Sequence, residues 1–371
     1  MELDGLRTVA AFGVVWIHVW ILRGNPSLPI GPFDFYKMIA ILGNGVDFFF
    51  VISGFCMYLM INKNFNASSY LHFIYKRFLR IAPAFFVSVL VYATIIKFDE
   101  PGFNFWYNVF MHLFFLNNVI TGNVISGPFW SIGTEWHFYL VLPFLIVLSR
   151  YIGLLKTVLV LSFLSLLLAC YMNLGYLPFD WWDKQILVRL PEFGVGIIAC
   201  WFFLKKAALP QFMRGIKGLF MAFIIMYGGR FLQFEGFLGS TGKAYFLFKS
   251  IALPIMCIGF GLIMYHTITQ KSILASILRS KVMTHFGKIS YSVYLWHSLS
   301  IFLLGKLLVH GLKPPNAPIT FILVSVITIV IAHFSYLLLE SFYFTKSSAP
   351  VKNINQDRNT VAQVLPASVK H

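Results

Sequence analysis

The chain of 371 residues is divided into a series of apolar runs, most of them about twenty residues long. At about 1.5 Å per residue, a helix of that length crosses the roughly 30 Å of hydrocarbon in a bilayer, where only internally bonded backbone is stable. The runs therefore predict an all-α, polytopic transmembrane helix bundle of about ten spans. The predicted spans are 6–22, 38–61, 78–97, 129–149, 157–173, 186–204, 217–234, 245–268, 289–309 and 317–339.

Composition agrees with a membrane protein. With 58% hydrophobic and 11% charged residues, the chain is too apolar for a soluble protein of this length. The net charge of +16 would suit a nucleic-acid-binding protein, but the basic residues form short clusters between apolar runs, a pattern typical of topology signals and anionic-lipid contacts. We expect membrane lipids as partners and no nucleic acid. The four cysteines have no paired or metal-like spacing, so no metal site is predicted.

One further apolar run, 103–119, decides the topology of everything after it. It is short and rich in asparagine, so we predict a re-entrant or interfacial helix. With the amino terminus in the cytoplasm, this assignment places most basic residues in cytoplasmic loops, in agreement with the positive-inside rule. Both termini are then cytoplasmic. Residues 1–344 form one predicted transmembrane domain, and the polar, aperiodic segment 345–371 is predicted to be a disordered cytoplasmic tail.

The first predicted span carries two ionisable side chains. Arg7 and His18 are eleven residues apart, which places them within roughly 20° of one helix face and about 16 Å apart along the axis. Ionisable groups inside a spanning helix are costly, so they favour a functional site. The alternative is an arginine that reaches headgroups and a histidine that bonds to a neighbouring helix.

Two carboxylates are predicted at a similar depth from the opposite side. His18 lies about 18 Å up its helix, while Asp47 lies about 13 Å and Glu135 about 9 Å below the outer ends of theirs. All three then share one layer in the outer half of the bilayer. A neutral imidazole beside a carboxylate suits a general base acting on a hydroxyl. A structural polar cluster that holds helices together is the alternative.

Further polar groups are predicted around this layer. Ser131 and Tyr139 repeat with Glu135 at intervals of four residues and form one helical stripe. His297 lies on a later span, where Tyr291 and Tyr294 are candidates to line the same cavity.

Arg77 and Arg80 are neighbours on one helix face at the cytoplasmic side, and paired guanidiniums suit phosphate oxygens. A basic cluster in this position is also explained by positive-inside topology alone.

Taken in order, six motifs resemble the acyltransferase-3 family of integral membrane acyltransferases, which includes O-acetyltransferases of bacterial surface polysaccharides. The resemblance covers residues 1 to about 343. The motifs are Leu3-Asp4-Gly5-Leu6-Arg7 with its spacing to His18, Gly45-Val46-Asp47 through Gly54-Phe55, Arg77-x-x-Arg80 with Ile81-Ala82-Pro83, Phe115-Leu116-Asn117-Asn118, Trp130-Ser131 through Glu135 to Phe138-Tyr139, and Ser290-Tyr291 through Tyr294 to His297.

This resemblance implies a ten-span enzyme of the bacterial cytoplasmic (inner) membrane. Such an enzyme takes an acyl group, usually acetyl, from cytoplasmic acyl-CoA and delivers it to a hydroxyl of a glycan or lipid-linked sugar at the outer face. Arg7, Arg77 and Arg80 would hold the phosphates of acetyl-CoA, and His18 would meet the thioester. We favour His18 as general base over a transiently acylated His18.

Two other functions remain open. A proton-coupled transporter or flippase for a glycolipid or small polar substrate would use the mid-membrane histidine and carboxylates as a proton relay. The lack of a visible internal repeat speaks against it. A non-catalytic membrane scaffold would leave the buried ionisable layer without a purpose.

Overall fold

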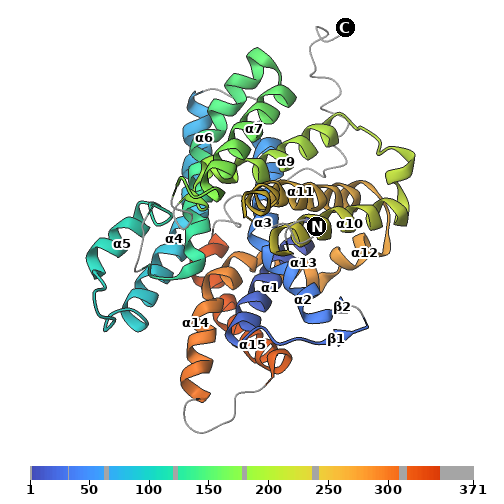
Figure 1. The fold of residues 1–371 in the computed structure, drawn as a ribbon. Helices are drawn as coiled ribbons and strands as arrows, with labels where there is room; N and C mark the ends of the chain where they lie inside the picture. Colours follow the sequence, from blue (N-terminus) through green and yellow to red (C-terminus); the bar gives the residue numbers. More distant parts are fainter. Residues whose placement is uncertain are drawn as a thin grey trace.

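The computed structural model describes residues 2–31, 33–61, 67–119, 124–177, 182–235, 242–308 and 316–342. Within these ranges the regular elements are helices, apart from one antiparallel hairpin of two-residue strands, β1 (Pro29–Ile30) and β2 (Phe33–Asp34). The helices pack into one bundle (Figure 1). The predicted all-α class is confirmed. The predicted tail 345–371 lies outside the described residues.

Nine stretches of the described chain are helical, long and apolar enough to cross a membrane. They correspond to nine of the ten predicted spans. They are α1 (Glu2–Leu22); α2 (Phe35–Ala40), η1 (Ile41–Asn44) and α3 (Gly45–Ile61) in continuation; α4 (Ala67–Ile95); η2 (Gly127–Phe129) with α6 (Trp130–Ile152); α7 (Leu154–Asn173); α9 (Ile186–Leu204); α10 (Gly215–Glu235); α11 (Gly242–Thr269); and α15 (Ala317–Ser335) with the π-helical turn η4 (Tyr336–Glu340).

The tenth predicted span, 289–309, forms α14 (Ser290–Leu308). This helix of 19 residues is long enough to cross but more polar than the other nine. Its polar side chains turn inward, and Ser292, His297 and Ser300 are fully buried. Because α14 packs against α1, α4 and α15, its low hydropathy reflects a polar interior and not exposure to water.

The predicted re-entrant or interfacial segment 103–119 contains a helix of nine residues, α5 (Phe105–Leu113). Nine residues cover only about 14 Å, half of the hydrocarbon thickness, so α5 does not cross as a helix. It lies beside α4 at the edge of the bundle (Figure 1). Three short elements complete the fold, namely η3 (Gln211–Met213), α12 (Ile273–Leu278) and α13 (Lys281–Lys288).

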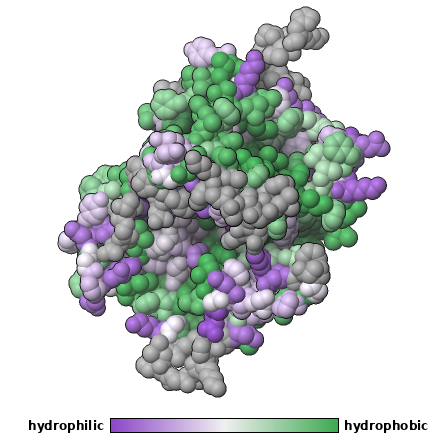
Figure 2. Space-filling model, in the orientation of Figure 1, coloured by the Kyte–Doolittle hydropathy of each residue, from purple (hydrophilic) through white to green (hydrophobic). Residues whose placement is uncertain are grey.

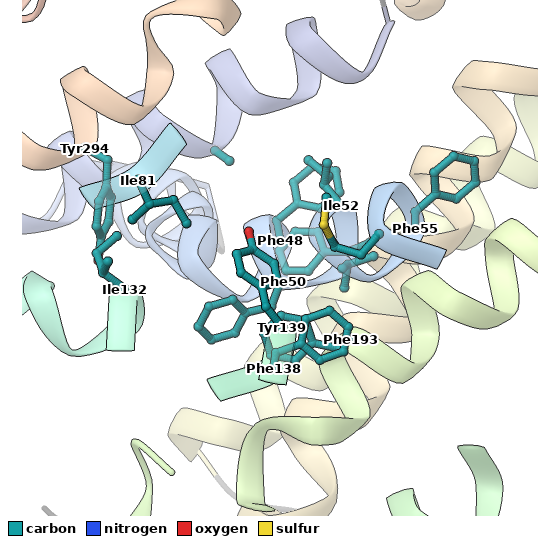
Figure 3. Close-up of a cluster of buried hydrophobic side chains, with 14 of the residues drawn as sticks. Phe48, Phe50, Ile52, Phe55, Ile81, Ile132, Phe138, Tyr139, Phe193 and Tyr294 are labelled. Atoms are coloured by element: carbon teal, nitrogen blue, oxygen red, sulfur yellow. The ribbon is translucent and has the colours of Figure 1, made fainter. Parts of the chain in front are cut away.

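Helix α3 lies at the centre and contacts α1, α6, α9 and α11. Its approach to α9 depends on glycine, because a Cβ built on Gly196 would lie 2.0 Å from the carbonyl oxygen of Val51. Aromatic rings fill the space next to this contact, where Phe193 stacks on Phe50 at 4.6 Å and on Phe138 at 3.9 Å between ring centroids. Figure 3 shows these rings gathered beneath α3.

The outside of the bundle is apolar. Much of the face in Figure 2 is hydrophobic, and the outward side of α7 exposes Leu159, Phe163 and Leu167 by half or more. Such a surface is stable only against lipid. The protein is therefore a multi-pass membrane protein whose polar residues are gathered inside.

Candidate functional site

A cavity of about 100 Å³ lies between α1, α3, α4, α6 and α14. Most of the site residues predicted from the sequence line it, although they come from segments far apart in the chain. These residues are Arg7, Arg77, Arg80, Ser131, Glu135, Tyr139, Tyr291 and Tyr294. We call this space the arginine cavity. His18, Asp47 and His297 are the predicted residues outside its lining.

Arg77 is the most deeply buried cation of the arginine cavity, with 7% of its surface exposed. Its Nη2 donates to the sulfur of Met60 at 3.2 Å, and its guanidinium lies 5.7 Å from the ring centroid of Phe73. The Nε atom is buried and has no hydrogen-bond partner within the described part of the chain. A buried guanidinium with such weak partners favours an anion in the cavity, because its unpaired donor groups are costly.

Arg7 reaches the same cavity from the first turns of α1. Its Nη1 donates to Asp4 Oδ1 at 3.0 Å, and its Nη2 donates to Cys56 Sγ at 3.4 Å. Cys56 itself lines the cavity. The lining thus carries three guanidiniums against the single carboxylate of Glu135, so its net charge is positive.

Glu135 is held by two hydroxyl groups. Ser53 donates to its Oε1 at 2.9 Å, and Tyr139 donates to the same atom. Ser131, Glu135 and Tyr139 all face the cavity from α6, as their spacing of four residues predicts. Ser53 had no predicted role; it lies on the same face of α3 as the cavity residues Phe49 and Cys56.

Tyr294 stands between the arginine cavity and the histidines. Its hydroxyl donates to the carbonyl oxygen of Pro128 at 2.5 Å and contacts Ser131 Oγ at 2.6 Å. Its ring lies 5.7 Å from that of His297, which is one turn further along α14. Figure 3 shows Tyr294 close to Ile132 and Ile81 on this side of the site.

His18 and His297 form a pair of imidazoles whose ring centroids are 5.0 Å apart. His18 Nδ1 lies 2.8 Å from the carbonyl oxygen of Val14, and His297 Nδ1 lies 2.6 Å from that of Tyr294. A carbonyl only accepts, so each Nδ1 carries a proton, and in the neutral ring Nε2 carries the lone pair. Nε2 of His297 lies 3.3 Å from the Ser298 hydroxyl. The His18 tautomer is thus held by its own helix backbone, where the sequence analysis expected a carboxylate.

Asp47 lies apart from both groups, at the contact between α3 and α9. Arg189 Nη1 donates to Asp47 Oδ1 at 3.0 Å and to Glu192 Oε1 at 3.2 Å. The guanidinium of Arg189 also lies 4.9 Å from the ring centroid of Trp130. The structure thus divides the predicted layer into the histidine pair, the arginine cavity with Glu135, and this ion-pair cluster.

Two groups of polar residues were missed by sequence reasoning. Glu192 is fully buried, and a carboxylate beside Arg189 in an apolar run is the signal that could have identified the ion-pair cluster. The other group surrounds Asn118, which contacts the Thr134 hydroxyl at 3.3 Å and His137 Nδ1 at 3.2 Å. His137 therefore serves the junction between the segment after α5 and α6, away from the cavity.

The site is suited to an anionic ligand and to proton transfer. Guanidiniums bind phosphate oxygens with directed, charge-assisted hydrogen bonds, and neutral imidazoles accept protons near neutral pH. Within the described ranges, no group of three or more His, Cys, Asp or Glu residues is arranged to hold a metal ion.

Comparison with known proteins bears on this chemistry. The chain is 26% identical to the peptidoglycan O-acetyltransferase OatA of Listeria monocytogenes, over 92% of its own length and 55% of that protein. It is 26% identical to the O-acetyltransferase OatA of Staphylococcus aureus, over 91% and 56% respectively. It is 25% identical to a putative acetyltransferase, ORF330, of Acidianus two-tailed virus, over 81% and 83%. No solved structure matches.

The chain spans about half the length of the two O-acetyltransferases named OatA. The family model described as "Acyltransferase domain" (acyltransferase-3) matches residues 2–337, which include every helix of the arginine cavity and both histidines of the pair. This match covers nearly the whole described bundle, so the chain belongs to the acyltransferase-3 family of membrane acyltransferases.

Proposed function

We propose that the protein transfers an acetyl group from acetyl-CoA to a hydroxyl group of a cell-surface glycan, in the cytoplasmic membrane of a bacterium. The observation that carries this proposal is the convergence of Arg7, Arg77 and Arg80 on one cavity, next to the histidine pair in which Nε2 of a neutral His18 offers a lone pair. The two O-acetyltransferase relatives support acetyl as the acyl group and a glycan as the acceptor.

The donor site is proposed in the arginine cavity. Acyl-CoA carries several phosphate charges, and the positively charged lining fits them. Arg77 suits this ligand best, since its buried Nε lacks a partner among the described residues and its Nη2 bonds only to a thioether. Arg7 and Arg80 would hold further phosphate oxygens. Acetyl-CoA would enter from the cytoplasmic side, as the predicted topology requires.

His18 is proposed as the general base. Its Nδ1 proton is committed to Val14, so the proton of the acceptor hydroxyl goes to Nε2 as the hydroxyl oxygen bonds to the acyl carbon. When the carbon–sulfur bond breaks, the imidazolium returns that proton to the departing sulfur. His297, 5.0 Å away between ring centroids, keeps the His18 ring in place by packing.

Glu135 is proposed to act inside the donor site and not on the acceptor. It holds Ser53 and Tyr139 and offsets part of the arginine charge. Asp47 is proposed to keep α3 in register with α9 through Arg189, which positions the cavity face of α3.

Two measurements on the purified full chain test the proposal. Cys56 lines the donor site and Cys170, on α7, does not, so acetyl-CoA should slow alkylation of Cys56 by N-ethylmaleimide and leave that of Cys170 unchanged. His18→Ala should abolish acetyl transfer to a glycan acceptor while preserving this protection. His333→Ala, which removes an imidazole from α15, is the matched control and should keep full activity.

Equal alkylation of Cys56 with and without acetyl-CoA would refute the donor site. Full transfer by His18→Ala would refute the base. If substrate crosses proteoliposome membranes without acyl-CoA, the transporter or flippase function gains support instead.

A further inference from the structure

A second cavity in the described part of the chain is larger than the arginine cavity. A groove of about 440 Å³ opens between α9, α11 and the connection that contains η3. Its lining is apolar and includes Val195, Phe202, Leu209 and Ile258. Phe202 and Ile258 are 40% and 46% exposed, so the groove opens on the outside of the bundle, where lipid surrounds a membrane protein.

Hydrogen bonds to α11 and to the residue after it fix the connection that forms one wall of this groove. Tyr265 on α11 donates its hydroxyl to the carbonyl oxygen of Ala207 at 2.5 Å, and His266 Nε2 donates to that of Gly215 at 2.9 Å. Gln270 accepts from the backbone N–H of Gly215 at 3.0 Å. Three side chains at and just beyond the C-terminal end of α11 therefore anchor the connection that forms this wall.

Four cations lie next to lining residues of the groove in the chain. Lys205 and Lys206 directly precede the lining residue Ala207, Arg214 directly follows the lining residue Met213, and Lys217 is one turn further along. All four are exposed, and no acidic residue occurs between 205 and 217.

Two of these cations have defined contacts. The Nε of Arg214 donates to the carbonyl oxygen of Leu209 at 2.7 Å, and Lys205 Nζ lies 4.1 Å from the ring centroid of Trp201. An apolar groove next to these four cations matches a ligand with a hydrocarbon chain and a negatively charged headgroup.

We propose that this groove binds one anionic glycerophospholipid, with an acyl chain between α9 and α11 and the headgroup phosphate on Lys205, Lys206 and Arg214. The acyl chain fills space that would otherwise leave apolar side chains without contacts. The cations add attraction for an anionic headgroup over a neutral one. This binding site is separate from the arginine cavity and does not depend on the proposed acyl transfer.

Native mass spectrometry of the full chain in mild detergent tests the site, with phosphatidylglycerol and phosphatidylcholine added in turn. The wild type should retain one phosphatidylglycerol more tightly than phosphatidylcholine. The double variant Lys205→Gln with Lys206→Gln should lose roughly tenfold or more in affinity for phosphatidylglycerol only. Arg150→Gln with Lys156→Gln is the matched control, because it removes two exposed cations at the junction of α6 and α7, away from the groove.

Ala208→Trp tests the apolar part of the groove, since Ala208 is an exposed lining residue. This variant should have a lower affinity for both lipids. A phosphatidylglycerol with a photoreactive acyl chain should crosslink to peptides of α9 and α11 in the wild type, which requires no variant. An equal loss of phosphatidylglycerol affinity in the two double glutamine variants would overturn the proposal, because it would show that any exposed cations attract the lipid. Crosslinks confined to other helices would also overturn it.

Discussion

At the residue scale, Arg77 and Arg189 differ in the groups that surround their buried guanidiniums. Its guanidinium is buried, yet it is bonded to a thioether and packed on an aromatic ring, partners that replace little of its hydration. Arg189 is buried as well, but Asp47 and Glu192 are within 3.2 Å of its Nη1. The first environment suits an incoming anion, and the second is a completed ion-pair cluster.

Arg77→Gln should therefore weaken the donor site selectively. Loss of one charge-assisted hydrogen bond costs about 1.5–3 kcal/mol, so we expect the KM for acetyl-CoA to rise about tenfold or more. The effect should shrink as salt is added, because salt screens the remaining attraction. Steady-state kinetics at low and high ionic strength measure the KM for acetyl-CoA and its dependence on salt.

Lys76→Gln is the matched control for this substitution. Lys76 precedes Arg77 in the chain and is equally charged, but it is only half-buried and does not line the cavity. The KM of this variant for acetyl-CoA should change little. A similar rise in both variants would show that the surface charge of α4, and not the cavity, attracts the donor.

At the element scale, the contact between α3 and α9 controls the shape of the site. Gly54 and Gly196 allow the two helices to meet backbone to backbone, since a Cβ on either would lie about 2 Å from a carbonyl oxygen of the partner helix. One face of α3 is thereby pressed on α9, and the opposite face presents Ser53 and Cys56 to the arginine cavity. Displacement of α3 would move both side chains.

Gly196→Ala should destabilise the bundle by about 2 kcal/mol or more, because the added methyl overlaps the Val51 carbonyl and the backbones must separate. Its apparent melting temperature in detergent should fall, and Cys56 should become more reactive to maleimide. Gly228→Ala on α10 is the control. Among the described residues, nothing beyond its own helix backbone and chain neighbours lies within 4 Å of its new Cβ, so the usual helix gain of about 0.5–1 kcal/mol should leave the melting temperature equal or higher.

At the scale of the whole molecule, the orientation of the helices decides which face meets the acyl donor. The predicted topology has cytoplasmic termini and a segment 103–119 that does not cross. Between Asp99 and Tyr151 the chain then crosses once, through α6, so the two residues lie on opposite sides. If 103–119 crossed as well, they would lie on the same side.

Cysteines placed at these two exposed positions distinguish the topologies. In inside-out and right-side-out vesicles, a membrane-impermeant maleimide should label Asp99→Cys only from the outer side and Tyr151→Cys only from the cytoplasmic side. Labelling of both from one side would overturn the predicted topology. Serine at the four native positions, Cys56, Cys170, Cys200 and Cys257, removes the background.

The helical class, the positions of the helices and the charged side chains of the arginine cavity follow from the sequence alone. Apolar runs of spanning length form helices in lipid, because the backbone must satisfy its own hydrogen bonds there. The spacing of Ser131, Glu135 and Tyr139 specified one helix face, and short-range geometry of this kind needs no tertiary information.

Only the tertiary structure decided how those faces meet. Depth along separate helices suggested one layer for His18, Asp47 and Glu135, but depth leaves the rotation of each helix open. Close glycine contacts rotate α3 so that Asp47 faces Arg189, while Ser53 faces Glu135 and Cys56 faces Arg7. The backbone of α1, through Val14, holds the His18 ring. Packing in three dimensions, which no single helix pattern contains, therefore separated the charged groups into three sites.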